Sequence, residues 1–386
     1  MSIRPFTINI PDERLEDLRS RLRAVRWPKP VDGEGWSDGT DLQFLQRFTE
    51  YWLNRFDWRA QERRLNGLPQ FMATVDGQEI HFVHVRGSGP APLPLILTHG
   101  WPGSFAEMEQ VIPLLADPQA HGGDPADAFH VVVPSLPGYG FSPAPKTKGV
   151  SSRRIADLWR GLMAKLGYAR FALQGGDIGA SVSVWTAKLF PQQVLGLHLN
   201  FIPGSYSPHL GHELPPISQE EQAYLDKVAS WGAEEGAYAH LHSTRPQTLS
   251  YALTDSPVGL AAWLVEKFRN WSDCNGDVEQ AFGFDTLLTD ISLYWFGDDI
   301  NGSLRLYKEN RLAPLTFNPG ERVAPPVGVA LFPRELPMPP RTWVERAFDV
   351  RRWTVMPRGG HFAALEQPDL LVEDIRAFFR LSRAGA

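Results

Sequence analysis

The sequence predicts an α/β protein with a doubly wound, mostly parallel sheet, preceded by a helical extension and interrupted by a helical insertion. Short apolar runs of strand length alternate with helical patterns over residues 76–200, as expected for a parallel sheet covered by helices. The alternation stops over residues 201–320, which are rich in aromatic residues, and resumes over residues 321–386. We therefore divide the chain into a helical extension (1–75), a first core part, an insertion and a second core part.

Composition and charge limit the possible functions. Of the 386 residues, 43% are hydrophobic and 21% are charged, which is typical of a globular protein. The net charge of −6 and the lack of a long basic run argue against nucleic acid or an anionic membrane as a partner. Cys274 is the single cysteine, which excludes an internal disulfide and a multi-cysteine metal site. We expect neither a metal nor an organic cofactor.

The sequence also bears on where the protein is found. It shows no signal-peptide pattern, and no apolar run approaches the ~20 residues of a membrane-spanning helix. We therefore expect a cytoplasmic protein without a membrane partner. A homodimer is compatible with this sequence.

Residues 1–75 contain two amphipathic helical patterns. The first runs from Leu15 to Val25 and is followed by Pro28, and the second runs from Leu42 to Leu53. Each pattern has an apolar face that needs a partner. We expect both helices to pack on the next domain along the chain.

The first core part contains five strand candidates and one clear helix. The strand candidates are Ile80–Val85, Leu93–Thr98, Phe129–Val133, Phe171–Leu173 and Val194–Asn200, and the helix runs from Ile155 to Leu166. His81 and His84 lie in the first of these strands. We interpret them as residues on the strand surface rather than as metal ligands.

The insertion follows a strand of the predicted sheet. Its helical candidates are Ser256–Trp271 and Phe284–Trp295, and we interpret it as a lid over the carboxyl ends of the strands. The alternative is a second lobe without a role in the site. The sheet pattern resumes at Pro326–Pro333 and Arg352–Met356, and a final amphipathic helix follows.

The central motif is Gly175-Gly-Asp-Ile-Gly179, which lies between a buried strand and a helical pattern that ends before Pro191. A strand, a tight turn flanked by glycines and a helix form the nucleophile elbow of α/β-hydrolases. The glycines two residues before and two after Asp177 let the strained turn close. For the pentapeptide alone, the alternative is an ordinary turn whose Asp caps the next helix.

An aspartate in place of the usual serine changes the chemistry of the elbow. A serine that opened a strained ring would remain as an ether, which water does not readily cleave. A carboxylate instead forms an ester, which activated water can cleave. Asp177 therefore favours alkyl transfer from an epoxide or an alkyl halide over acyl transfer.

Two later residues complete the nucleophile–acid–base order of this fold. His361 lies in a Gly-Gly loop after the last strand, where the general base belongs. Glu335 directly follows the preceding strand and can orient the imidazole and stabilise the imidazolium. Asp298 and Asp299 are alternatives for the acid, but they lie in the insertion without a preceding core strand.

The segment His99-Gly-Trp-Pro-Gly103 follows the strand that supplies the oxyanion-hole loop in this fold. The backbone N–H groups of Trp101 and Ile178 would donate hydrogen bonds to the oxyanion formed during ester hydrolysis. The Trp101–Pro102 peptide is a candidate for the cis form. The alternative is a Gly/Pro turn with no donor role.

Together these motifs resemble the microsomal-type epoxide hydrolases over nearly the whole chain. The resemblance rests on His99–Ser104, Gly175–Gly179, Leu306–Asn310, Arg358–Ala364 and the N-terminal Arg26-Trp27-Pro28. It implies an ether-bond hydrolase with Asp177 as nucleophile, Glu335 as acid and His361 as base. It also implies two lid tyrosines that polarise the epoxide oxygen, and local context matches them to Tyr307 and Tyr238. Tyrosine suits this role because its ordinary pKa of about 10 keeps the phenol protonated at neutral pH.

The implied function is conversion of a small-molecule epoxide to a vicinal diol. Members of that family often have Trp after the nucleophile, where this chain has Ile178. We also expect this protein to lack the anchoring helix of the vertebrate enzymes. Some bacterial members act on natural-product epoxides, including those of enediyne pathways, so both detoxification and antibiotic biosynthesis stay open.

Two other functions stay open on the sequence alone. One is a haloalkane dehalogenase, a class that commonly binds halide with an aromatic N–H after the nucleophile, which Ile178 lacks. The other is a non-catalytic ligand-binding relative, against which the intact triad argues.

Overall fold

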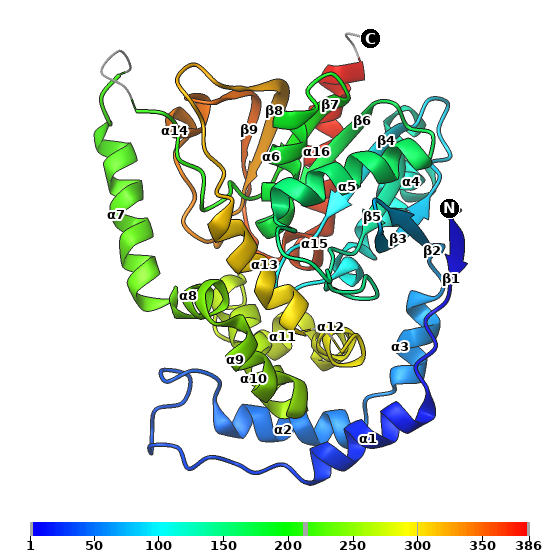
Figure 1. The fold of residues 1–386 in the computed structure, drawn as a ribbon, viewed down its shortest axis with the longest axis vertical. Coiled ribbons are helices and arrows are strands. Elements are labelled where there is room, and N and C mark those ends of the chain that lie inside the picture. The colour runs from blue at the N-terminus through cyan, green and yellow to red at the C-terminus, as the bar shows by residue number, and fades with distance from the viewer. Residues whose placement is uncertain (1–2, 211–214, 299, 384–386) are drawn as a thin grey trace.

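The computed structural model describes residues 3–210, 215–298 and 300–383. In these residues nine strands form one sheet in the order β1-β2-β3-β5-β4-β6-β7-β8-β9 (Figure 1). The six strands from β5 to β9 in this order run parallel, whereas β1, β2 and β3 pair antiparallel and β3 joins β5 antiparallel. The strands are β1 (Arg4–Phe6), β2 (Gln70–Val75), β3 (Gln78–Val85), β4 (Leu93–Thr98), β5 (Phe129–Pro134), β6 (Phe171–Gly175), β7 (Val194–Leu199), β8 (Val323–Leu331) and β9 (Phe348–Val355). The predicted mostly parallel sheet is confirmed.

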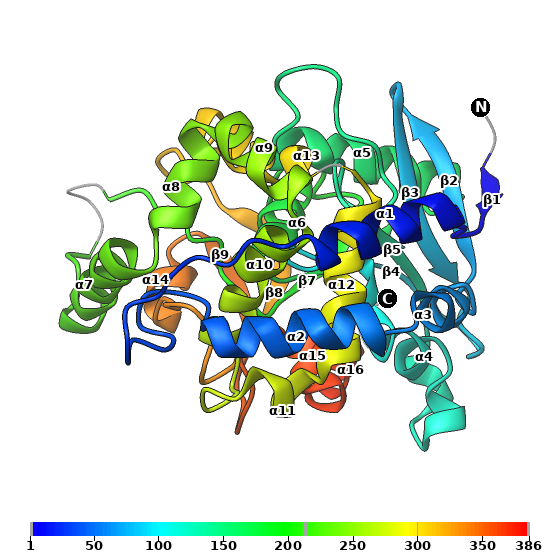
Figure 2. The same ribbon diagram turned by 90° about the horizontal axis from the view of Figure 1, so that it is seen from below.

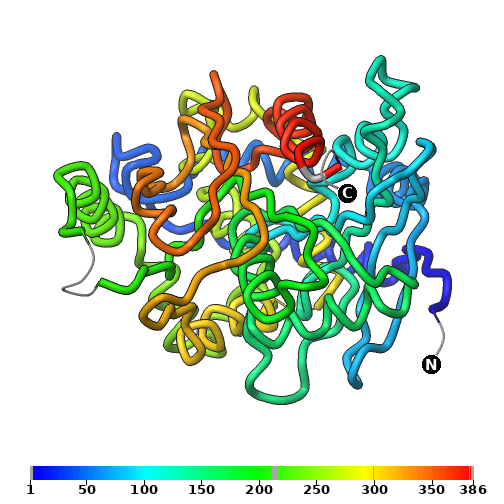
Figure 3. Tube along the Cα trace, turned by 90° about the horizontal axis from the view of Figure 1, so that it is seen from above, coloured from blue at the N-terminus to red at the C-terminus, as the bar shows by residue number. Residues whose placement is uncertain are grey.

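Helices cover both faces of this sheet (Figure 3). Helices α5 and α6 pack on each other over one face, and α4 packs with α16 over the other. The core helices are α4 (Val111–Ala116), α5 (Ser152–Lys165), α6 (Asp177–Leu189), α14 (Arg341–Glu345), α15 (Ala363–Glu366) and α16 (Pro368–Arg383). Among the described residues, no helix is long and apolar enough to cross a membrane.

The insertion is helical, as predicted, and lies beyond one end of the sheet (Figure 1). Its helices are α7 (Gln219–Glu234), α8 (Ala237–Thr244), α9 (Pro246–Asp255), α10 (Pro257–Trp271), α11 (Val278–Phe282), α12 (Phe284–Phe296) and α13 (Ile300–Leu312). The start of α10 shows the local signals from which this helix could be predicted. Pro257 occupies its first turn, and the Ser256 side chain accepts a hydrogen bond from the N–H of Gly259.

The N-terminal extension differs from the prediction in two ways. Besides α1 (Asp12–Arg23), α2 (Leu42–Asn54) and α3 (Trp58–Leu65), it supplies the edge strands β1 and β2. Helices α1 and α2 also contact the insertion, through α10 and α12, rather than the next domain along the chain (Figure 2).

Helix α12 provides the physical reason for this second difference. Every residue from Leu287 to Phe296 is buried, so the helix needs apolar partners on all sides. The extension supplies some of them, because the rings of Phe48 and Phe284 lie 5.0 Å apart and those of Trp58 and Phe296 lie 4.8 Å apart.

One of the two histidines of β3 also differs from the prediction. His81 is buried, and its ring nitrogens lie 2.8 Å from Ser135 Oγ and 2.9 Å from Gln70 Oε1. His84 is half-buried, and its Nε2 lies 3.0 Å from the Tyr168 hydroxyl. Burial lowers the pKa of His81 to about 3, so its ring is a neutral part of the core. The strand-surface interpretation was wrong for His81.

Candidate active site

The elbow has the strained geometry that the sequence predicts. Asp177 is the first residue of α6, just after β6, and has a φ of +46°, a region that non-glycine residues rarely occupy. A Cβ at Gly175 would collide with the carbonyl oxygen of Gly179, and one at Gly179 would collide with that of Thr98. Only glycine fits at these two positions, so the turn can hold the Asp177 side chain out at the end of the sheet.

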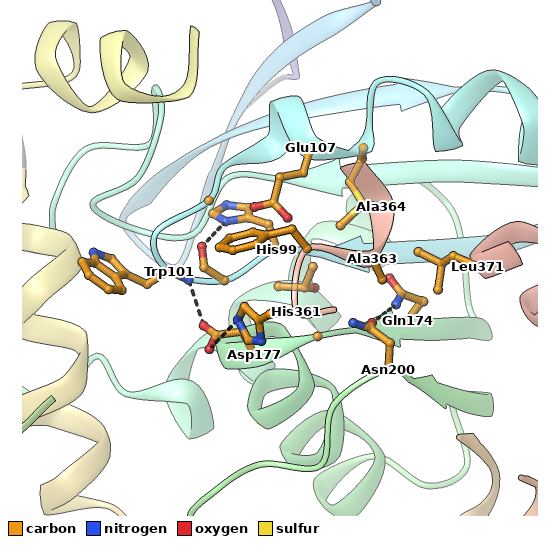
Figure 4. A pocket seen from close by; sticks show the side chains of 16 residues that line it. His99, Trp101, Glu107, Gln174, Asp177, Asn200, His361, Ala363, Ala364 and Leu371 are labelled. Atoms are coloured by element: carbon orange, nitrogen blue, oxygen red, sulfur yellow. Dashed lines mark hydrogen bonds and ion pairs between the residues drawn. The ribbon is translucent and has the colours of Figure 1, made fainter. Parts of the chain in front are cut away.

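One predicted oxyanion-hole donor contacts Asp177 directly. The backbone N–H of Trp101 donates a hydrogen bond of 2.8 Å to Asp177 Oδ1 (Figure 4). Gly100 allows this approach, because a Cβ there would collide with the carboxylate. The Trp101–Pro102 peptide is cis, as anticipated. Ile178 lies in the first turn of α6, where a helix leaves its N–H groups without an internal acceptor.

The three triad candidates meet at this point. His361 Nδ1 lies 2.5 Å from Glu335 Oε1, and His361 Nε2 lies 3.5 Å from Asp177 Oδ2. The exposed fractions of the side chains are 15% for Asp177, 4% for His361 and 1% for Glu335. Because Nδ1 faces the carboxylate of Glu335, that nitrogen carries a proton and Nε2 is directed at the nucleophile. The arrangement fits a base held between an orienting acid and a nucleophile.

The charges around His361 control its protonation. Burial alone would lower the pKa of His361, but the negative charge of Glu335 and the hydrogen bond to Asp177 raise it well above the usual value. With both carboxylates ionised, His361 is therefore an imidazolium near neutral pH. Removing the charge of Asp177 would remove one of the interactions that hold this proton.

The two tyrosines gather over the oxyanion loop although they are far apart in the sequence. Tyr238 of α8 and Tyr307 of α13 have ring centroids 5.8 Å apart, and their rings lie 5.3 Å and 6.0 Å from the Trp101 ring. Burial is the main cause that raises the pKa of each phenol, and the negative charge of Asp177 adds to it. Both groups are therefore protonated hydrogen-bond donors near neutral pH.

The alternative acid Asp298 lies outside this cluster. Its side chain is 63% exposed and accepts two hydrogen bonds, of 2.7 Å and 2.6 Å, from Arg14 of α1. Asp299 lies outside the described residues. Glu335 is thus the acid candidate in contact with His361.

In the described part of the chain, no three His, Cys, Asp or Glu side chains group in a way that could hold a metal ion.

Comparisons with known proteins agree with this geometry. The family described as "Epoxide hydrolase N terminus" matches residues 3–108, and "alpha/beta hydrolase fold" matches residues 94–254. "Epoxide hydrolase 1" of Sus scrofa is 39% identical over 98% of this chain and 89% of its own length. The chain belongs to the epoxide hydrolase family.

Two further relatives each cover 99% of this chain. A protein of Stigmatella aurantiaca (strain DW4/3-1), provisionally named an epoxide hydrolase, is 46% identical over 99% of this chain and 86% of its own. The structure of Aspergillus niger epoxide hydrolase matches with a TM-score of 0.85 and 33% identity, covering 99% of this chain and 97% of that one. The predicted α/β-hydrolase fold and family are confirmed.

The sequence did not reveal how the helical insertion contacts His361. The carbonyl oxygen of Trp271, at the end of α10, accepts a 2.9 Å hydrogen bond from the backbone N–H of His361, and the two rings lie 5.2 Å apart. From the same helix, Lys267 places its ammonium 4.8 Å from the centre of the Tyr238 ring. Tryptophans in the insertion were a visible signal, but no sequence pattern indicates which of them contacts the last loop of the core.

Proposed function

We propose that this epoxide hydrolase opens a small-molecule epoxide through a covalent ester on Asp177. One observation carries the proposal: two protonated tyrosines lie over the same loop that binds the Asp177 carboxylate through the N–H of Trp101. Such a site offers a nucleophile that can attack an epoxide carbon. It also offers two hydrogen-bond donors for the epoxide oxygen, whose bond to that carbon breaks.

The first step forms one bond and breaks another. The N–H of Trp101 holds Asp177 Oδ1, so Oδ2 is the oxygen that attacks an epoxide carbon. The C–O bond of the ring breaks, and the oxygen takes a proton from Tyr238 or Tyr307. The raised pKa of each phenol keeps this proton in place until the far more basic alkoxide develops. The phenol therefore gives up its proton only as the ring opens.

The second step follows from the change of charge on Asp177. Ester formation neutralises this carboxylate and removes one of the interactions that raise the pKa of His361. The proton that His361 then loses returns to the phenolate left by ring opening. The neutral imidazole can act as a base toward water, while Glu335 stabilises the imidazolium that forms again. Water attacks the carbonyl carbon, and negative charge develops on Oδ1 beside the N–H of Trp101, with the N–H of Ile178 as the second donor. Collapse releases the diol and restores the carboxylate.

The function can be tested with a panel of aryl, aliphatic and natural-product epoxides together with haloalkanes of matched size. We expect vicinal diol from at least one epoxide, no halide release, and a loss of at least about a thousandfold in Asp177→Asn. Asp157→Asn, a substitution at a partly exposed position on α5, is the matched control and should keep full activity. Chiral analysis of the diols would report which carbon is attacked. Halide release that outpaces diol formation, or a folded protein inactive on the whole panel, would contradict the proposal.

A further inference from the structure

The lid carries a buried lysine against one of its two tyrosines. Lys267 of α10 is only 6% exposed, and its ammonium lies 4.8 Å from the centre of the Tyr238 ring and 5.7 Å from that of the Trp271 ring. Lysine is almost never buried to this extent unless its charge is paired. Its place against a tyrosine of the proposed site therefore calls for a functional explanation.

The backbone fixes the lysine at this position. Lys267 precedes Trp271 by one turn of α10, so both side chains lie on the same face of the helix. The carbonyl oxygen of Trp271 accepts a hydrogen bond from the N–H of His361, and Tyr238 lies in the first turn of α8. The ammonium is thus held against the Tyr238 ring by the same end of α10 that contacts the loop of the base.

An adjacent carboxylate compensates the charge of this lysine. Glu266 Oε2 lies 2.6 Å from Lys267 Nζ, and the Glu266 side chain is the more exposed of the two, at 20% against 7%. Glu266 Oε1 also accepts a 2.9 Å hydrogen bond from Asn270 Nδ2. Because a buried ammonium is tolerated when it is paired and hydrogen-bonded, Lys267 can lie against Tyr238 as a cation.

The other charges around Tyr238 oppose the loss of its proton. Burial is the main cause that raises its pKa, and the negative charges of Asp177, Glu266 and Glu235 raise it further. Burial likewise raises the pKa of Tyr307, but the interaction between the two hydroxyls raises the pKa of Tyr307 and lowers that of Tyr238. Of the two phenols, Tyr238 is the one that this interaction favours as an acid.

The ring of Tyr307 has a different neighbour. The ring of His242, on α8, lies 4.9 Å from that of Tyr307, and His242 Nε2 accepts a 3.1 Å hydrogen bond from Trp263 Nε1. Burial and then the charge of Lys267 lower the pKa of His242 to about 3, so this imidazole is neutral. Among the described residues, no Lys or Arg side chain lies over the Tyr307 ring. A cation therefore faces one lid tyrosine and not the other.

We propose that Lys267 is a positioning residue that makes Tyr238 the proton donor of the lid pair and leaves Tyr307 as a hydrogen-bond donor. The inference rests on the covalent route proposed above and decides between its two tyrosines. As Asp177 Oδ2 bonds to the epoxide carbon, the C–O bond of the ring breaks and the epoxide oxygen takes the proton of Tyr238. The resulting phenolate spreads its negative charge over the ring, so the ammonium stabilises it more than the neutral phenol. Lys267 keeps its own proton, and Tyr238 regains one when His361 becomes neutral.

The first test measures ring opening in Lys267→Met, which keeps an unbranched side chain of similar length and removes the charge. Rapid quenching and intact-protein mass spectrometry follow formation and loss of the ester. We expect ring opening to slow by about tenfold or more, whereas ester hydrolysis should not slow. Lys188→Met is the matched control. The Lys188 side chain is 11% exposed, pairs with Glu321 at 3.0 Å and lies 4.7 Å from the centre of the Phe317 ring, and its variant should behave like the parent.

A double-mutant cycle separates an effect of charge from an effect of packing. In Tyr238→Phe the ring remains beside Lys267 but has no proton to give. Adding Lys267→Met to this variant should slow ring opening by about twofold or less. Adding it to Tyr307→Phe should give the full loss, because Tyr238 is still the donor. A packing role would give the same loss in the parent and in both tyrosine variants.

Glu266→Gln is a second variant for which charge and packing predict opposite results. The amide oxygen can still accept a hydrogen bond from the ammonium, and the substitution removes one of the negative charges that raise the pKa of Tyr238. Ring opening should therefore be at least as fast as in the parent. If the ion pair only held the lid in place, Glu266→Gln and Lys267→Met would both slow ring opening.

The outcomes distinguish this inference from the function on which it rests. Parental ring opening in Lys267→Met, an undiminished loss in the Tyr238→Phe background, or slower ring opening in Glu266→Gln would overturn the inference alone. Failure to detect any ester in the parent or in His361→Gln would overturn both. If Lys267→Met does not fold, the ring-opening rate of Glu266→Gln decides the matter.

Discussion

His361→Gln is expected to open epoxides and then stop at the covalent ester. Glutamine approximates the size of the imidazole but cannot act as the base, and loss of general-base catalysis costs roughly 10²–10⁴-fold. The loop should tolerate the change because its backbone is held by the 2.9 Å hydrogen bond from the N–H of residue 361 to the carbonyl oxygen of Trp271. Intact-protein mass spectrometry should show the mass of the protein plus one substrate.

The control for this experiment is His84→Gln, a histidine of β3 that contacts Tyr168 and has no part in the proposed chemistry. It should turn over normally and show no adduct. Normal turnover by His361→Gln would remove His361 from the mechanism. An inactive His361→Gln variant without adduct would contradict the proposed order of steps, in which Asp177 opens the ring before His361 acts as the base.

Phenylalanine in place of both lid tyrosines should nearly abolish ring opening. Tyr238→Phe and Tyr307→Phe each remove one hydroxyl and keep the ring that packs near Trp101. We expect each single variant to slow ring opening by about 10-fold or more, and the double variant by at least about 10³-fold. The effects need not add, because both hydroxyls serve the same oxygen.

Pre-steady-state kinetics can isolate this effect from hydrolysis, which should change little once the ester has formed. Tyr251→Phe is the matched control, since Tyr251 lies in the lid on α9 and is well exposed. Unchanged ring-opening rates in both single variants and in the double variant would exclude the tyrosines from the mechanism.

The sheet and the elbow were predictable because their signals are local. Buried strand runs, the glycines around Asp177 and the Gly-Gly loop before His361 each constrain a few neighbouring residues. The order of nucleophile, acid and base then placed Glu335 beside His361, and the structure shows the contact. The prediction succeeded where backbone geometry restricts the residue type.

Tertiary packing was less accessible to sequence reasoning. The apolar faces of α1 and α2 required a partner, but nothing local indicated the lid helices α10 and α12. His81 sits in an alternating strand, and its burial depends on Phe6, Phe105 and Phe141, which contact its ring from distant segments.

Asp290 did leave a signal in the sequence. It is the one acid in the buried stretch of α12 from Leu287 to Phe296, and such a residue is rarely buried without a specific reason. The fold places α12 beside the oxyanion loop, where the Tyr294 hydroxyl donates a hydrogen bond to the carbonyl oxygen of Gly103.

The origin of the new oxygen in the diol tests the covalent route most directly. Excess enzyme is mixed with epoxide in ¹⁸O-labelled water and limited to a single turnover. If Asp177 is the nucleophile, its own oxygen leaves with the product and the oxygen of water remains on the carboxylate. We predict a largely unlabelled diol and label in the peptide that contains Asp177. A diol that carries ¹⁸O from the first turnover would show that water attacks the epoxide directly and would contradict the covalent route.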